Sequence, residues 1–181
     1  GSVASPPGAS PTLPIHGVTN TGSGGGAVGQ NVPTAISHDD FGGNGSSGVA
    51  VIRYKIASTS TAKASGGAIS FYNSKTIHVF EGSGTFTAPG SFSETVEYLV
   101  VAGGGGGSAD DATGGGGGAG GYRTGTTPIS GPGTTTIQVG GGGIGGLGRT
   151  SRGLGQAGTP SYFGTPITSA GGGEGATQSE P

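Results

Sequence analysis

Apolar and polar residues alternate in several stretches of the chain, and a period of two is typical of β-strands with one buried face. The clearest stretch is Val49–Ile56. One of its faces carries Arg53 and Lys55, and the other carries Ala50, Ile52, Tyr54 and Ile56. A strand with one solvent-exposed face and one buried face is therefore predicted here.

Four further stretches have strand character. Thr95–Ala102 is apolar on both faces near its end, as expected for a central strand of a sandwich. Thr134–Val139 alternates, Thr76–Glu81 is shorter, and Thr85–Thr87 follows it across a turn at Gly82–Gly84. No window sustains the apolar spacing of a helix. We expect an all-β, jelly-roll-like β-sandwich without significant helix, with a core of Ile52, Tyr54, Ile77, Val79, Phe86, Val96, Tyr98, Val100, Ile137 and Val139.

Glycine makes up 47 of the 181 residues and is concentrated in the tracts Gly103–Gly121, Gly140–Gly148 and Gly171–Gly175. Flexible linkers are one interpretation of such tracts. Isolated apolar residues within or beside them favour ordered, packed segments, partly of polyproline-II form: Ala119, Tyr122, Ile144, Leu147 and Leu154. If the tracts pack closely, a side chain at Gly116 or Gly142 has no room.

The composition shifts along the chain divide it into four parts. Residues 1–41 are predicted to be an extended connector rich in proline and glycine, and residues 42–56 to contain the closing strand of a module. Residues 57–75 hold a linker and a strand, and residues 76–181 form the glycine-rich β module. The chain does not begin with Met, so we expect a processed protein or a segment of a longer polypeptide.

Charge and composition narrow the functional classes. The chain has no cysteine and a net charge of −2, so disulfides and a basic footprint for nucleic acid are not expected. No stretch approaches the ~20 apolar residues of a membrane span. We predict a non-catalytic protein that needs no cofactor and no metal.

Few residues suggest a catalytic, metal-binding or ligand-binding site. His38-Asp39-Asp40 favours a polar turn over an acid–base site, and Asp110-Asp111 lacks the spacing of an EF-hand. Chance G-x-G-x-x-G matches precede no helix and predict no nucleotide site. Exposed tyrosines and charges near the tracts are candidate contacts with sugars or a receptor: Asp110, Asp111, Tyr122, Arg149, Arg152 and Tyr162.

Four blocks in order resemble a known family. They are GSGTFTAPGSFSETVEYLVVAGGGGG at Gly82–Gly107, GGGGGAGGYRTG at Gly114–Gly125, TTTIQVGGGGIGG at Thr134–Gly146 and SYFGTPITSAGGG at Ser161–Gly173. They are similar to the glycine-rich module of phage tail fibres, virion proteins and bacterial surface proteins. The resemblance covers about residues 76–175 and implies an all-β module of fibres or adhesins, without catalysis.

One departure from the family order is informative. A segment like GGNGSSGVAVIRYKI closes modules of this kind, whereas here it stands first, at Gly42–Ile56. This order suggests a tandem repeat, or a subunit whose strand completes its neighbour by β-strand addition. The predicted inter-subunit strand is Val49, Ala50, Val51, Ile52, Arg53, Tyr54, Lys55 and Ile56.

Two functions follow as expectations. The first is an extracellular, self-assembling structural subunit of a cell-surface filament or virion fibre, with copies of itself as partners. The second is a tail-fibre-type adhesin whose glycine-rich loops contact a cell-surface glycan or receptor.

Overall fold

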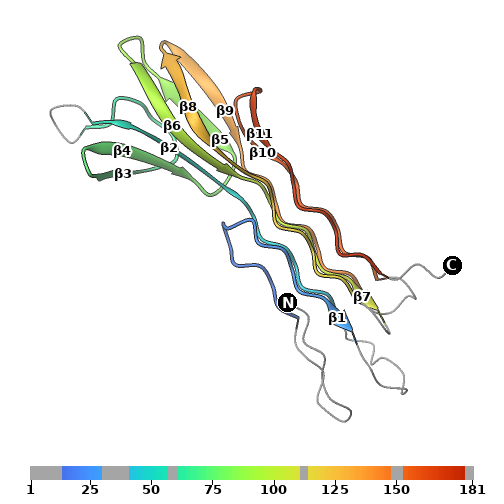
Figure 1. Ribbon diagram of the computed structural model, residues 1–181. Coiled ribbons are helices and arrows are strands. Elements are labelled where there is room, and N and C mark those ends of the chain that lie inside the picture. The colour runs from blue at the N-terminus through green and yellow to red at the C-terminus, as the bar shows by residue number, and fades with distance from the viewer. Residues whose placement is uncertain (1–13, 30–40, 57–60, 111–113, 148–152, 178–181) are drawn as a thin grey trace.

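The protein has an elongated shape, with a β-sandwich at one end and glycine-rich tracts running side by side toward the other (Figure 1). This computed structural model describes residues 14–29, 41–56, 61–110, 114–147 and 153–177. No helix occurs in these ranges. The predicted all-β sandwich is therefore confirmed.

A five-stranded antiparallel sheet forms the larger layer, in the order β3-β4-β2-β6-β8. Its strands are β2 (Val49–Lys55), β3 (Ala68–Tyr72), β4 (Lys75–Phe80), β6 (Ser93–Val101) and β8 (Tyr122–Ser130). The order of the second, four-stranded sheet is β11-β10-β9-β5. It contains β5 (Gly84–Ala88), β9 (Gly133–Gln138), β10 (Ser161–Phe163) and β11 (Ile167–Ser169).

The strands predicted from alternation all form, and β4 and β5 lie in different sheets on either side of the predicted turn. Strand β8 was not predicted because Gly125 and Pro128 interrupt its pattern. Proline is tolerated there because β8 is an edge strand with one free side. A two-residue parallel pair, β1 (Val28–Gly29) and β7 (Ala109–Asp110), lies far from the sandwich (Figure 1).

The core lies between the two sheets and is rich in aromatic rings. Of the predicted core, Ile52, Tyr54, Phe86, Val96, Val100 and Ile137 are buried, while Tyr98 and Val139 pack against the cluster half-buried. Ile77 and Val79 were predicted wrongly. Strand β4 instead turns Thr76, His78 and Phe80 inward. The outer face of this sheet is also partly apolar, so apolar character alone does not identify the inner face of β4.

Strand β2 is the central strand of its own chain's sheet. It pairs with β4 from Ala50 to Lys55 and with β6 from Val49 to Arg53. As predicted, Arg53 and Lys55 face outward. The single chain thus needs no donor strand from a neighbour, and an exchange of β2 between copies would require this pairing to open and re-form.

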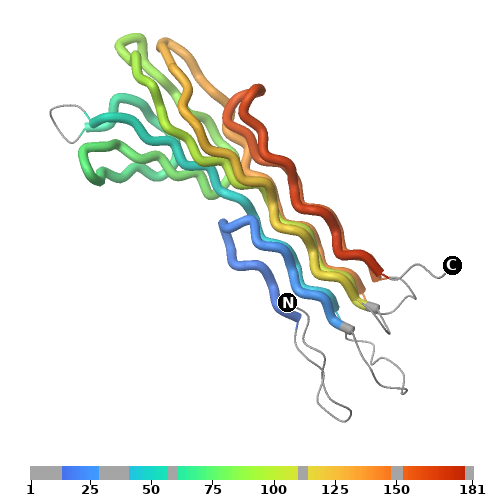
Figure 2. Tube along the Cα trace, viewed as in Figure 1, coloured from blue at the N-terminus to red at the C-terminus, as the bar shows by residue number. Residues whose placement is uncertain are grey.

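Beyond the sandwich the tracts pack into what we call the glycine bundle: a central segment, residues 102–109, surrounded by residues 22–28, 42–48, 114–121, 140–146, 153–159 and 170–176. Figure 2 shows the tracts running alongside one another as continuations of the sandwich strands. All residues of the central segment are buried. The predicted packing of the glycine tracts is observed in these residues.

Hydrogen bonds radiate from the central segment with a period of three. The amides of Gly103, Gly104 and Gly105 donate to Thr159 O (3.1 Å), Ser46 O (2.9 Å) and Gly118 O (2.8 Å). The next three residues donate to the same three tracts in the same order, at Gln156, Gly43 and Gly115. The carbonyls accept from the other three tracts: Gly172 donates to Gly103 O, Gly143 to Gly104 O and Gly25 to Gly105 O.

This arrangement satisfies the buried backbone groups directly, without a sheet ladder. It also leaves no space for side chains, since a Cβ on Gly142 would lie 2.2 Å from Gly45 O. The prediction for Gly142 therefore holds. That for Gly116 was wrong, because a Cβ there meets its nearest atom, Gly25 O, at an ordinary 3.5 Å. Side chains fit on the outside of the bundle, where Ile144, Leu147 and Leu154 are exposed.

Candidate functional site

The outer face of the five-stranded sheet carries a groove of about 490 Å³, which we call the sheet-face groove. Three neighbouring strands supply its lining: Val51 and Arg53 from β2, Glu97, Tyr98 and Leu99 from β6, and Tyr122, Thr124, Gly125 and Thr126 from β8. The register explains the grouping. Leu99 lies opposite both Val51 and Thr124, and Glu97 lies opposite both Arg53 and Thr126.

Tyr122 stands at one end of the sheet-face groove with 70% of its surface exposed. It begins β8 directly after the glycine tract and pairs with Val101 of β6. A large aromatic side chain that stays this exposed beside a concave surface is a common contact for ligands.

Charged residues gather at the other end of the sheet-face groove. Arg53 donates from Nε and Nη2 to Glu97 Oε2, at 2.6 and 2.5 Å, and Lys75 pairs with Glu97 Oε1. These two cations hold the pKa of the Glu97 carboxyl below its ordinary value, with the Lys75 hydrogen bond as the largest cause. Lys55 lies opposite Lys75 on the same face, so this end of the face carries three cations and one carboxylate.

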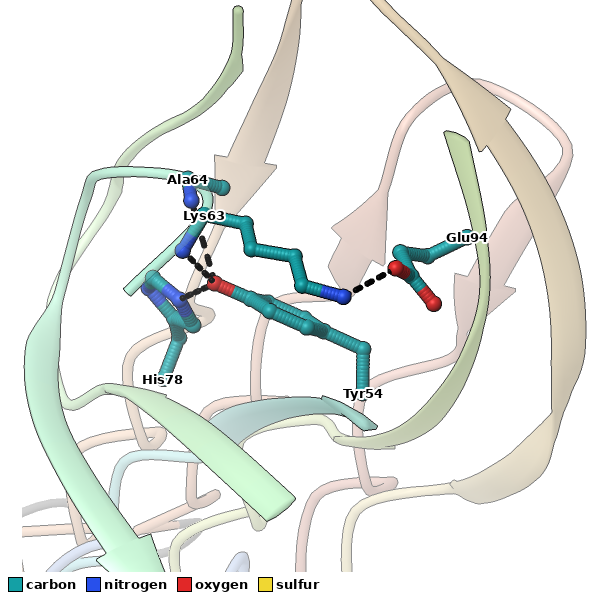
Figure 3. Close-up of polar contacts among 5 residues, drawn as sticks. All are labelled: Tyr54, Lys63, Ala64, His78 and Glu94. Atoms are coloured by element: carbon teal, nitrogen blue, oxygen red, sulfur yellow. Dashed lines mark hydrogen bonds and ion pairs between the residues drawn. The ribbon is translucent and has the colours of Figure 1, made fainter. Parts of the chain in front are cut away.

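A second polar cluster centres on the buried side chains of Tyr54 and His78 in the core, with the half-buried Lys63 and Glu94 beside them (Figure 3). The Tyr54 hydroxyl accepts from the amides of Lys63 (3.0 Å) and Ala64 (3.1 Å) and contacts His78 Nε2 at 3.1 Å. The Lys63 side chain pairs with Glu94 above the ring. The cluster fastens residues 63–64 to the sandwich.

The protonation of His78 follows from its partners. Nδ1 lies 2.7 Å from Gly66 O, and because a carbonyl only accepts, Nδ1 carries the hydrogen. Nε2 then accepts from the Tyr54 hydroxyl, which leaves the ring neutral. Burial lowers the pKa of His78 below its ordinary 6.5, against the opposing effect of the Gly66 bond. All three polar atoms, Nδ1 and Nε2 of His78 and the hydroxyl oxygen of Tyr54, have hydrogen-bond partners, which indicates a structural role.

The predicted contact residues do not form one site. Tyr122 lines the sheet-face groove, whereas Tyr162 is half-buried on β10 of the other sheet. Asp110 lies in β7 at the far end of the bundle (Figure 1), and Asp111, Arg149 and Arg152 fall outside the described residues, as does His38-Asp39-Asp40. Sequence reasoning missed the roles of Arg53 and Glu97, because their pairing depends on a register between distant strands.

Within the described ranges no group of three or more His, Asp or Glu residues is placed to hold a metal ion. In the same part of the chain, no helix has the length and apolar character needed to cross a membrane.

The fold and the bundle together define an all-β, glycine-rich domain. A family model described as a glycine-rich domain matches residues 78–181, from β4 to the end of the chain, and the protein belongs to this family. No curated protein and no solved structure matches the chain. Residues 42–56, which precede the matched region, complete both the five-stranded sheet and the bundle.

Proposed function

We propose that the protein is a non-catalytic structural subunit of an extracellular fibre, as a separate subunit or a tandem repeat, on a cell surface or a virion. The observation that carries this proposal is the glycine bundle. Its central segment is bonded to six surrounding tracts through backbone groups, and the Ser108 hydroxyl adds side-chain bonds to Gly115 and Ala176. Such a network of hydrogen bonds provides stiffness without disulfides, which suits a protein without cysteine.

The geometry of the bundle supports polyproline-II conformation in its tracts. A polyproline-II helix has three residues per turn and points successive backbone groups in three directions. The donors of the central segment reach three different tracts and then repeat. Glycine fills crowded positions in collagen for the same reason that a Cβ has no room at Gly142.

Self-assembly is tested on the full chain. Negative-stain electron microscopy and light scattering of the purified protein are expected to show regular filaments. Discrete, non-associating particles at every concentration up to the solubility limit would exclude a subunit that assembles by itself. Intact mass of the native material separates independent subunits, near 16.9 kDa, from tandem repeats at a multiple of it.

Exchange of β2 between units is the assembly mode we propose. Val51 and Leu99 are cross-strand partners, and opposite residues in antiparallel strands lie about 4.5–5.5 Å apart at Cα, within disulfide range. In a Val51→Cys, Leu99→Cys double variant, exchanged strands would give a covalent ladder of chains on a non-reducing gel. Disulfides formed only within chains, in material that still forms filaments, would disprove exchange. Each single variant serves as the control.

A tail-fibre-type adhesin is the second candidate. The exposed Tyr122 beside a groove of ligand-sized volume favours it. Both functions are compatible with one fibre, because the groove lies on the sandwich and the stiff bundle is separate from it.

A further inference from the structure

We propose that the sheet-face groove binds a carboxylate-bearing polysaccharide, a chain of uronic-acid-type sugars. This inference rests on the second of the two proposed functions and names its ligand class. The structural role rests on the glycine bundle, which contains none of the groove residues, so it can be tested separately although β2 supplies both groove residues and the proposed exchanged strand.

The size and the aromatic wall of the groove fit sugar rings. Its volume of about 490 Å³ lies within the range of about 300–1,000 Å³ that is usual for small-molecule sites. The C–H groups on one face of a sugar ring carry partial positive charge, and they stack on the negative face of an aromatic ring such as Tyr122. Val51 and Leu99 give an apolar floor beside it.

Polar groups of the same groove complement sugar hydroxyls. Thr124 and Thr126 follow Tyr122 along the same face of β8, and a threonine hydroxyl both donates and accepts. A row of one aromatic and two hydroxyl side chains along a strand matches an extended chain in which ring faces and hydroxyl groups alternate. An apolar ligand would displace water from these hydroxyls without offering them a hydrogen-bond partner.

Charge selects an acidic sugar over a neutral one. The chain as a whole is negative, at −2, yet this end of the face carries Arg53, Lys55 and Lys75 and a single carboxylate, that of Glu97, which pairs with Arg53 and Lys75. Two positive charges therefore remain uncompensated there. Arg53 keeps 52% of its side chain exposed, and its bonds to Glu97 use the Nε hydrogen and one of the two Nη2 hydrogens. The guanidinium has further donors to offer a carboxylate, for which its planar fork is suited.

The test uses the full chain with polygalacturonate as the probe, by titration calorimetry or affinity electrophoresis at 150 mM NaCl. Dextran serves as a neutral sugar chain and polyphosphate as an anion without sugar rings. Polygalacturonate is expected to bind at least about tenfold more tightly than either, since it alone offers both stacking and charge.

Three variants identify the groove. Tyr122→Ala and Arg53→Gln are each expected to weaken polygalacturonate binding at least about tenfold, consistent with the loss of one stacking or charged contact. Tyr72→Ala is the matched control, because Tyr72 is 76% exposed on β3 but does not line the groove. Glu97→Gln removes the competing carboxylate and is expected to strengthen binding, a gain that misfolding cannot produce.

Several results would overturn the proposal. If polyphosphate bound as tightly as polygalacturonate, the binding would be non-specific charge attraction. The same conclusion would follow if Tyr122→Ala bound polygalacturonate with the affinity of the parent chain. Absence of polygalacturonate binding together with loss of self-association in Arg53→Gln would assign the groove to a contact between copies. Filament formation by Tyr122→Ala without sugar binding would leave the structural proposal intact, so the two failures are distinguishable.

Discussion

Gly105 and Gly173 are packed so closely that a side chain on the first would collide with the second. A Cβ on Gly105 would lie 1.9 Å from the Gly173 carbonyl oxygen, while a Cβ on Gly173 itself would meet nothing within 4 Å. The two glycines belong to adjacent tracts of one bundle and have opposite requirements. Their difference comes from which side of each tract faces inward.

Gly105→Ala is expected to destabilise the protein. The methyl group would force a backbone carbonyl aside, and overpacking of this kind costs about 1–3 kcal/mol or more. Gly173→Ala is the matched control, expected to be neutral or stabilising by up to about 1 kcal/mol because alanine restricts the unfolded chain. Chemical denaturation of the two variants and the parent measures this. Equal stabilities for both variants would mean that the tracts do not pack as described.

Hydrogen exchange is expected to separate buried from exposed amides within the same glycine-rich sequence. The amides of Gly104, Gly105 and Gly106 donate to Ser46, Gly118 and Gln156 and are enclosed by six tracts, so they should exchange only with global unfolding. Residue-resolved exchange by NMR at neutral pH provides the measurement. Rapid exchange throughout residues 103–107 would instead indicate mobile linkers.

Thr76→Val is expected to stabilise the protein by about 1 kcal/mol. The Thr76 side chain is fully buried, and its hydroxyl has no hydrogen-bond partner among the described residues. An unsatisfied buried hydroxyl costs about 1–3 kcal/mol, and valine has nearly the same shape without it. Thr95→Val on the exposed face of β6 is the control and should change stability little. Loss of stability in Thr76→Val would show that the hydroxyl is satisfied.

The sequence predicted those features that side-chain patterns encode. Strand β2 was predicted with its buried and exposed faces, because Arg53 and Lys55 alternate with apolar residues. In β4, Ile77 and Val79 led to the wrong prediction of the inner face, because the buried face carries His78 and Phe80 instead. His78 is accommodated in the core because Tyr54 and Gly66 satisfy both its nitrogens. The pairing of Arg53 with Glu97 needed the β2–β6 register, which no local pattern encodes.

The glycine tracts show a different limit. The apolar residues among the tracts predicted that the tracts are ordered and packed. A run of identical residues, however, does not reveal which of them face inward. Gly116 and Gly142 look alike in sequence, and only Gly142 is blocked by a neighbouring carbonyl. The inward direction is set by the three-residue repeat of hydrogen bonds to distant tracts, which are unrelated in sequence position.

Acid is expected to destabilise the sandwich through His78. Its pKa is lowered in the folded protein by burial, so below its ordinary value of 6.5 the unfolded chain binds a proton that the folded chain does not. The contribution of His78 to stability is complete above pH 6.5 and declines as the pH falls toward the folded pKa. At pH 5 the loss reaches at most about 2 kcal/mol, at 1.36 kcal/mol per pH unit.

Denaturant unfolding at pH 8 and pH 5 measures this loss, with His78→Asn as the comparison. Asparagine can still donate to Gly66, because its amide nitrogen takes the place of Nδ1, but it does not titrate. The variant is expected to be less stable at pH 8, because it fills the aromatic cluster poorly, and to lose less stability between pH 8 and pH 5. The exposed Glu97 titrates only at lower pH, since Lys75 and Arg53 lower its pKa, so it does not obscure the comparison. An equal loss in both proteins would show that His78 does not cause it.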